Sequence, residues 1–481
     1  MKRVIFFMLA LTSLFSFMSC AGKTATKSGE IHESLVDSTE ETTMKSEVSY
    51  EDLSPYVISQ ASYPKMAKYP DEMSFIDEKT GILDDESFME VYEAWHNDKM
   101  VQLDQPEGYK NGMDGFLNIT IRQFLSNSKG QNLVYSPLNV FMTLAMLAEV
   151  TDGNSRQQIL ELLGSESIEA LRAQAKSVWN ANYLDDGAVT SVLANSLWLN
   201  KDVNYIKSTM DSLANNYYTS SFSGRMGSDK FNKALQSWIN EQTGGLLEEQ
   251  ASGLEMSPDT ILALASTIYF RAKWGSEFSE SNTEKGIFNL SGTNNETLEC
   301  DFMNKSESKN YYWADNFSAV GLSLEGSGNM WFLLPEEGVA LDEILTDTQT
   351  MDFLHQGEAW SNSKYLVVNL SVPKFDVASE IDLNSGLQEL GVTDIFDSLQ
   401  SDFLPMTADT DGIYLSRSEH AARVAIDEEG VTAAAYTVMM MCGAAMPPDE
   451  EVEFVLDRPF LFAITGLDNQ LLFVGVVNRP I

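Results

Sequence analysis

The sequence predicts an α+β fold with a large β-sheet, and three observations indicate this class. From residue 112 onward, apolar side chains first recur at helical spacing, and after residue 260 short apolar runs dominate. Helices that come early and strands that come late are typical of α+β folds. The apolar fraction of 43% is sufficient for a substantial core, and no internal repeat is visible.

Three helical segments are expected in the first half. The first covers residues 113–125, where one face carries Met113, Phe116, Leu117, Ile121, Phe124 and Leu125. A second helix begins after Ser136, because Pro137 suits a first-turn position. Residues 241–245, which end in two glycines, are typical of a helix C-terminus.

Four apolar runs predict buried strands. These runs cover residues 261–270, 329–334, 365–372 and 471–477. The large sheet is therefore expected to draw on the second half of the chain.

The first twenty residues have the features of an export signal. Lys2 and Arg3 precede an apolar stretch that is too short for an ordinary membrane span. Residues 17–20 resemble the lipobox of bacterial lipoproteins, in which the cysteine is acylated, although Phe17 replaces the usual leucine. We expect a lipid on Cys20 and a place in the cell envelope, as an outer-membrane lipoprotein or a secreted protein. An ordinary signal peptide is the alternative.

The chain divides into four parts by composition. Residues 1–20 form the lipoprotein-type signal peptide, and residues 21–49 form a tether that is expected to be disordered, since it has few large apolar side chains. Residues 50–111 are an N-terminal extension rich in aromatics, to which the sequence assigns no function. Residues 112–481 form the main domain.

Charge and cysteine content exclude several classes of function. The chain has 71 acidic and 31 basic residues, a formal net charge of −40, which repels nucleic acids. We expect this charge to serve solubility, and attraction of a basic partner is the alternative. Three cysteines form no disulfide framework, and a bridge between Cys300 and Cys442 stays open.

No recognisable enzyme motif is present. The sequence has no His-Glu-x-x-His, no paired Cys-x-x-Cys, no P-loop and no Gly-x-Ser-x-Gly. Its four histidines form no cluster along the chain. We therefore expect no catalytic residue, no metal and no cofactor, and an unrelated enzyme is the least favoured hypothesis.

One segment, residues 428–448, has an unusual composition. It is small and apolar at its start, ends in two prolines and lies between two strand-like runs. Its residues have mixed helix and strand propensity, which suits a loop that changes conformation. An ordinary core strand or a buried helix is the alternative.

Nine short motifs follow the order in which they occur in the serpin family, over about residues 112–481. Examples are residues 132–137, 194–198, 238–243, 269–274 and 457–460. Each motif is weak alone, but their shared order is specific, so the chain resembles a serpin. The resemblance implies the serpin fold, with three β-sheets, eight or nine helices and an exposed reactive-centre loop.

The resemblance also implies a function, the suicide inhibition of serine proteases by a monomer. The family pattern, counted from Gly430, places the reactive bond between Ala444 and Ala445. A small residue at Ala444 suits an elastase-like target, with cysteine proteases as the other target class. Cleavage after any of the three methionines at 439–441 would instead give substrate behaviour. A non-inhibitory serpin, acting as a binding or scaffold protein or as a protease substrate, is the alternative.

The hinge of the loop decides between these functions. It comprises Glu428, Glu429, Gly430, Val431, Thr432, Ala433, Ala434 and Ala435. By the family register, every second residue from Val431 to Met441 faces the core, and Thr437 is the one polar member. Tyr436 lies on the other face, where the family has a small residue. No charge or proline interrupts residues 431–441, which favours insertion and hence an inhibitor.

A second implied site is the region where the main sheet opens. It comprises Ser136, Asn139, Ser266 and His420. The family has serine where this chain has Asn139, and asparagine where it has Ser266. We hypothesise that this exchange preserves hydrogen bonding to His420.

Overall fold

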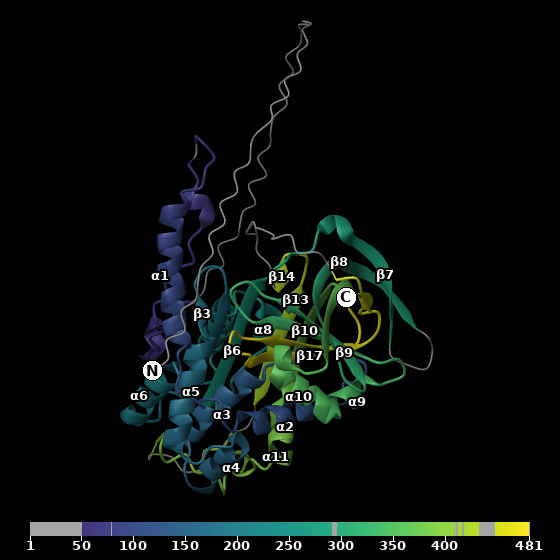
Figure 1. The fold of residues 1–481 in the computed structure, drawn as a ribbon. Coiled ribbons are helices and arrows are strands. Elements are labelled where there is room, and N and C mark those ends of the chain that lie inside the picture. The colour runs from purple at the N-terminus through teal and green to yellow at the C-terminus, as the bar shows by residue number, and fades with distance from the viewer. Residues whose placement is uncertain are drawn as a thin grey trace, which may run out of the picture. The chain divides into compact units, whose positions relative to one another are not determined.

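The computed structural model describes residues 51–480 except 78, 291–295, 408, 410, 411, 416, 417 and 432–447. Within this part the chain folds into two β-sheets, with helices packed on and between them (Figure 1), so the predicted α+β class is confirmed. Among the described residues, no helix combines the length and the apolar character needed to cross a bilayer.

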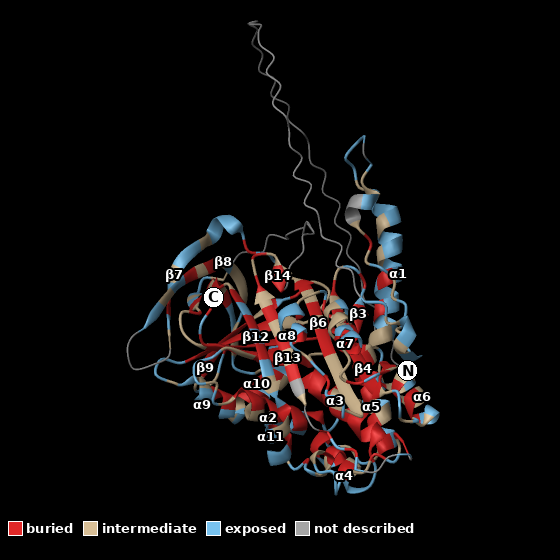
Figure 2. Ribbon diagram, turned by 180° about the vertical axis from the view of Figure 1, so that it is seen from behind, coloured by how far each residue is buried: buried red, intermediate tan, exposed pale blue. Residues whose placement is uncertain are grey.

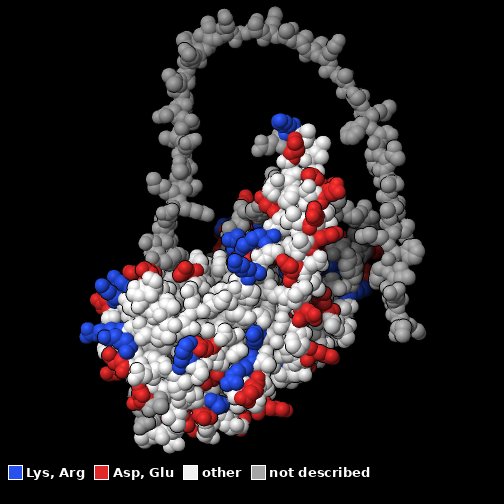
Figure 3. Space-filling view, turned by 90° about the vertical axis from the view of Figure 1, so that its left-hand side faces the viewer, with Lys and Arg blue, Asp and Glu red and all other residues white. Residues whose placement is uncertain are grey.

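The N-terminal extension packs along the main body. It contains η1 (Ser54–Tyr56), β1 (Val57–Ser59), η2 (Glu72–Phe75) and α1 (Asp85–Leu103). Asp84 begins α1 by accepting a hydrogen bond from the Ser87 N–H, as a capping side chain does. Figure 3 shows acidic side chains along the part of this extension that projects from the main body.

Ten further α-helices follow in the described residues. They are α2 (Met113–Leu125), α3 (Pro137–Val150), α4 (Gly153–Leu163), α5 (Ile168–Asn182), α6 (Lys207–Asn216), α7 (Asp229–Gln242), α8 (Glu248–Ser252), α9 (Leu341–Thr346), α10 (Thr348–Gln356) and α11 (Leu383–Glu389). The three predicted helices correspond to α2, α3 and α7. The total exceeds the expected eight or nine because α1 belongs to the extension and α9 and α10 are separated only by Asp347.

The first sheet, here called the main sheet, has eight strands. They are β1, β3 (Leu184–Asp185), β4 (Thr190–Asn200), β5 (Thr219–Gly224), β6 (Leu262–Lys273), β12 (Phe375–Asp382), β13 (Glu419–Ile426) and β14 (Gly430–Val431). Their order is β1-β5-β4-β6-β14-β13-β12, with β3 beside β4. The extension thus adds β1 to the outer edge of β5.

The second sheet has nine strands. They are β2 (Leu133–Tyr135), β7 (Thr283–Asn289), β8 (Thr297–Trp313), β9 (Phe317–Ser323), β10 (Asn329–Pro335), β11 (Ser363–Pro373), β15 (Glu451–Val455), β16 (Phe460–Thr465) and β17 (Leu471–Val477). Three sheets were expected, and the described residues form two. The reason is that the 17-residue β8 pairs with β7 and β11 along most of its length and with β9 at its end.

The main sheet lies between two apolar layers. On its inner face α3 is buried at every residue except Thr143 (Figure 2). On its outer face α7 packs over a cluster that includes Trp198, Phe222, Phe231 and Trp238. A strand of this sheet therefore points alternate side chains toward α3 and toward α7.

Candidate functional site: an open slot in the main sheet

The main sheet is interrupted between β6 and β13, and this gap is here called the slot. At its upper end β14 pairs on one side with Lys273 and Ala272 of β6, and on the other with Ile426 of β13. Below β14, no backbone pairing joins β6 to β13 in the described part of the chain. Over residues 262–271, the edge of β6 that faces the slot thus pairs with none of the described residues.

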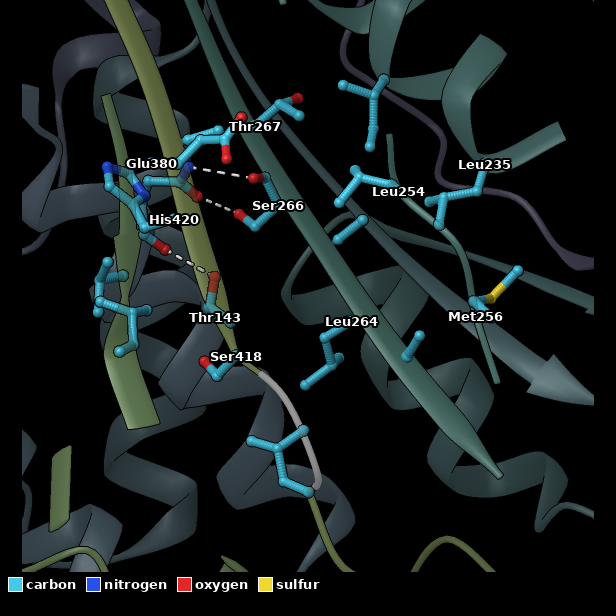
Figure 4. Close-up of a pocket in the computed structure, with 18 of the residues that line it drawn as sticks. Thr143, Leu235, Leu254, Met256, Leu264, Ser266, Thr267, Glu380, Ser418 and His420 are labelled. Carbon is cyan, nitrogen blue, oxygen red and sulfur yellow. Dashed lines mark hydrogen bonds between the residues drawn. The ribbon is translucent and has the colours of Figure 1, made fainter. Parts of the chain in front are cut away.

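A cavity of about 350 Å³ lies in the slot and reaches both faces of the sheet. Figure 4 shows side chains of β6 and β13 on opposite sides of it. Its inner wall is α3, with Asn139, Val140, Thr143, Leu144 and Leu147. Its outer wall is α7, α8 and the segment after α8, with Leu235, Ile239, Leu247, Gln250, Ala251 and Leu254. The slot therefore has room for a further strand between two apolar layers.

The hinge begins at an ion pair whose carboxylate is buried and whose lysine is partly exposed. The Glu428 carboxylate accepts hydrogen bonds from the Thr283 hydroxyl at 2.7 Å and from the Lys374 ammonium at 2.6 Å. Burial alone would raise the pKa of Glu428, but the bonds from Lys374 and Thr283 outweigh it and hold this pKa below its usual value. The pair ties the start of the hinge to β7 and to the link between β11 and β12.

The next residues of the hinge are held in a tight turn. The Asp427 side chain accepts hydrogen bonds from the N–H groups of Glu429 and Gly430. The Trp274 indole donates to the Asp427 carbonyl at 2.8 Å. A Cβ atom on Gly430 would lie 2.4 Å from the Ala272 carbonyl oxygen, so only glycine fits this approach to β6.

Val431 is the last described residue of the hinge. It is 1% exposed and belongs to the same buried cluster as Ala272 and Ile426, on the side of α3. Its side chain thus faces the core, as expected. The remaining predicted residues lie outside the described part of the chain: Cys20, Thr432, Ala433, Ala434, Ala435, Ala444 and Ala445. Cys300 is a buried free thiol, and Cys442 also lies outside the described part.

The structure brings the four residues of the sheet-opening region together beside the slot. The Ser266 hydroxyl hydrogen-bonds Asn139 Oδ1, and the Asn139 amide donates to the Ser266 carbonyl at 3.2 Å (Figure 4). The hydrogen bond to His420 Nε2 comes instead from the backbone N–H of Ser136, at 3.0 Å. The hypothesis that the exchange preserves hydrogen bonding to His420 is therefore wrong: Asn139 and Ser266 bond each other, and His420 of β13 is tied to the start of α3 through the backbone of Ser136.

His420 is a neutral residue of the core. It is 4% exposed and lies edge-on to Tyr135, with ring centroids 5.4 Å apart. Its Nε2 accepts the Ser136 N–H, so the ring proton is on Nδ1. Burial lowers the pKa of His420 to about 4, because the charged form would be desolvated.

Sequence reasoning missed a buried ion pair in the extension. Lys99 of α1 lies 3.9 Å from Asp186, in the turn after β3, and the two are 5% and 0% exposed. The Lys99 ammonium also donates to the Gly326 carbonyl at 2.5 Å. The neighbouring Glu325 N–H bonds the carbonyl of Lys273, where β14 meets β6. The only sequence signal was that Lys99 continues a helical stripe of aromatics, a place where a lysine is unusual.

Comparisons with known proteins agree on one family. The family model described as "Serpin (serine protease inhibitor)" matches residues 115–480. The leukocyte elastase inhibitor of Homo sapiens is 28% identical over 363 residues, which cover 74% of this chain and 94% of the human protein. The alpha-1-antiproteinase of Rattus norvegicus is 26% identical over 392 residues, 79% of this chain and 92% of the rat protein.

Solved structures show the same fold. The native state of the thermophilic serpin tengpin has a TM-score of 0.69 at 23% identity, and the match covers 78% of this chain and 95% of tengpin. The native stressed conformation of Arabidopsis AtSerpin1 has a TM-score of 0.64 at 23% identity, covering 77% and 98%.

Proposed function

Since this chain belongs to the serpin family, we propose that it traps serine proteases covalently, by inserting its cleaved loop into the slot of the main sheet. The observation that carries the proposal is the edge of β6 that no described residue covers below β14, next to a hinge that has already begun a strand at Gly430 and Val431. Relatives that are named as inhibitors support the same reading.

The first step uses the target's own catalytic machinery. The serine hydroxyl of the protease attacks the carbonyl carbon of Ala444, and its proton passes through the protease's base to the amine of Ala445. The bond between Ala444 and Ala445 breaks and an ester forms between Ala444 and the protease. The loop is then free at this end, with the protease attached.

The second step is the insertion of the freed segment. Because β14 runs antiparallel to both β6 and β13, each further loop residue pairs one step along both strands. Each new backbone hydrogen bond stabilises the inserted form by about 1 kcal/mol, and fourteen strand residues span about 46 Å. Insertion thus has a driving force, and it carries the protease far enough to distort its oxyanion hole and stall hydrolysis of the ester.

The target class follows from the residues around the reactive bond. Gly443 and Ala444 suit a protease with a small binding pocket, and no lysine or arginine lies between Gly430 and Pro448 for a trypsin-like one. The printed name of the human relative, leukocyte elastase inhibitor, supports an elastase-like serine protease. Cysteine proteases are the second class to assay.

The alternative is a non-inhibitory serpin that serves as a scaffold or a substrate. The test is to incubate the full chain with pancreatic elastase and to analyse the products on a denaturing gel. We expect a stable complex with the summed mass of the two proteins. Complete cleavage in the loop with no such complex would contradict the inhibitor and leave the alternative.

We also propose that Cys20 carries a lipid that holds the protein in the cell envelope. The support is the apolar stretch that ends at Ser19-Cys20, after Lys2 and Arg3. Expression in a bacterium fed a clickable fatty acid should label the chain, and Cys20→Ala should abolish the label. Labelling that persists in Cys20→Ala would contradict the anchor.

A further inference from the structure

Two buried polar atoms in the cavity of the slot lack a hydrogen-bond partner. They are Thr267 Oγ1 and Gln250 Oε1, and neither finds a donor or acceptor among the described residues. Thr267 is only 4% exposed. Burying a polar atom without a partner is unfavourable, so a polar group that entered the cavity would gain a hydrogen bond there.

Both residues belong to the outer side of the slot. Thr267 pairs across the sheet with Ala194, which lies in the cluster under α7, so Thr267 points toward that layer. Gln250 lies on α8, between Leu247 and Leu254, which also line the cavity. Two small side chains on this face also line the cavity: Ala265 of β6 and Ala421 of β13. Together they form a socket with apolar walls, a small-residue floor and a polar end, which fits an aromatic side chain that carries a hydroxyl.

The strand register identifies the occupant. Gly430 pairs with Lys273 and Val431 with Ala272, so continued pairing with β6 brings residue 436 opposite Thr267. On the other side Val431 pairs with Ile426, so continued pairing with β13 brings residue 436 opposite Ala421. The two registers come from different strands, and both place residue 436 beside a residue that lines the cavity. Residue 436 is a tyrosine, and in a strand that continued from Val431 it would point outward, because Val431 points inward and the period of a strand is two.

We propose that this socket receives the side chain of Tyr436 when the loop inserts, with its hydroxyl donating a hydrogen bond to Gln250 Oε1. The proposal rests on the proposed function, since it requires the insertion. Tyr436 is thus a positioning residue that fixes the register of the inserted strand. A strand shifted by one residue would turn Tyr436 toward α3 and leave the Gln250 oxygen unpaired.

The neighbouring residue supports the same register. Thr437, the polar member of the core-facing set, comes opposite Ser266 and His420, in the polar cluster of the inner face. The other core-facing positions meet apolar partners: Ala433 meets Phe270 and Val424, and Ala435 meets Ile268 and Ala422. In this register, Tyr436 reaches polar side chains on the outer face of the slot and Thr437 reaches polar side chains on its inner face.

The test is a double-mutant cycle with Tyr436→Phe and Gln250→Leu in the full chain, before and after cleavage of the loop by chymotrypsin. Its apolar pocket suits a cut after one of the methionines at 439–441, where substrate behaviour is expected and the cleaved chain is released. In the cleaved form we expect each substitution to lower the midpoint of thermal unfolding by about 1–2 °C, scaled to this chain length. The double variant should be no worse than either single one, because both remove the same bond. In the uncleaved form, Tyr436→Phe should leave the midpoint unchanged.

The outcomes separate this inference from the proposed function. Additive effects in the cleaved form, or no effect of Tyr436→Phe there, would overturn the socket even if the wild-type chain still forms the denaturation-resistant complex. A wild-type chain that gains no thermal stability on cleavage would overturn the insertion itself, and the socket with it.

Discussion

The two edges of β6 differ in a way that accounts for the proposed activity. Along one edge, β6 pairs with β4 continuously from Leu262 to Arg271. Along the other edge, its partners within the described part of the chain are Gly430 and Val431 alone. An unpaired edge is a template for another strand, and proteins usually cover such edges, as β1 covers the outer edge of β5 here. This sheet instead keeps an internal edge open, next to the segment that can fill it.

The largest effect is expected from a charge on the inserted strand, because it should prevent insertion at the open edge of β6. Ala433→Glu would bury a carboxylate between Phe270 and Val424, which costs several kcal/mol, so we expect no complex with elastase and full cleavage. Thr432→Glu is the matched control, because residue 432 of the inserted strand would face outward, opposite Arg271, and this variant should still form the complex. Equal complex yields from the two variants on a denaturing gel would contradict the register.

The open side of the comparison is bordered by β13, which carries the neutral His420. Its pKa is lowered to about 4 from the usual 6.5, so between these values the unfolded chain binds a proton that the folded chain does not. Stability should therefore fall as the pH falls from about 6.5 to about 4, by on the order of 3 kcal/mol.

Urea unfolding of the intact chain across this pH range would measure the effect. His420→Gln keeps an acceptor for the Ser136 N–H but does not titrate, so it should show a smaller pH dependence. An identical pH dependence in the variant and the wild type would mean that His420 is not the group responsible.

At the upper end of the slot, a substitution of Lys374 would remove the ion pair that holds the start of the hinge. Lys374→Ala would leave the buried Glu428 carboxylate without its ion partner, and because Lys374 is partly exposed we expect a loss of about 2 kcal/mol. The intact variant should also lose inhibitory activity faster on storage, since the hinge is less firmly held. Lys285→Ala, which removes an exposed pair with Asp301, should cost clearly less, because solvent screens that pair. Equal losses from the two variants would show that the hinge ion pair has no special role.

The smallest effect is expected at the hydrogen bond between Asn139 and Ser266. A double-mutant cycle with alanine at both positions should give a coupling free energy of about 1 kcal/mol in urea unfolding of the intact chain. Strictly additive losses would show that the exchange of serine and asparagine at these positions is not compensatory.

Much of the fold was predictable because its elements carry local signals. The predicted run at 471–477 is β17, and the run at 365–372 lies within β11. Ser136 and Pro137 begin α3 as expected, since the serine side chain caps it. These features depend on neighbours in sequence, which the pattern of residue types records directly.

Other features depend on contacts that the sequence does not record. Nothing in the three residues of β1 indicates that they pair with β5, more than 150 residues away. The length of β8, which joins two expected sheets into one, depends on its partners β7, β9 and β11. At the site, the residues around His420 were predictable by motif, but the donor to its ring is a backbone N–H, which no choice of side chain reveals.

Hydrogen exchange of β6 before and after cleavage of the loop tests the central claim most directly. We predict that peptides covering residues 262–271 become strongly protected after cleavage, as the free edge acquires a strand, whereas β10, in the other sheet, stays unchanged. Unchanged exchange over residues 262–271 in the cleaved chain would contradict the account.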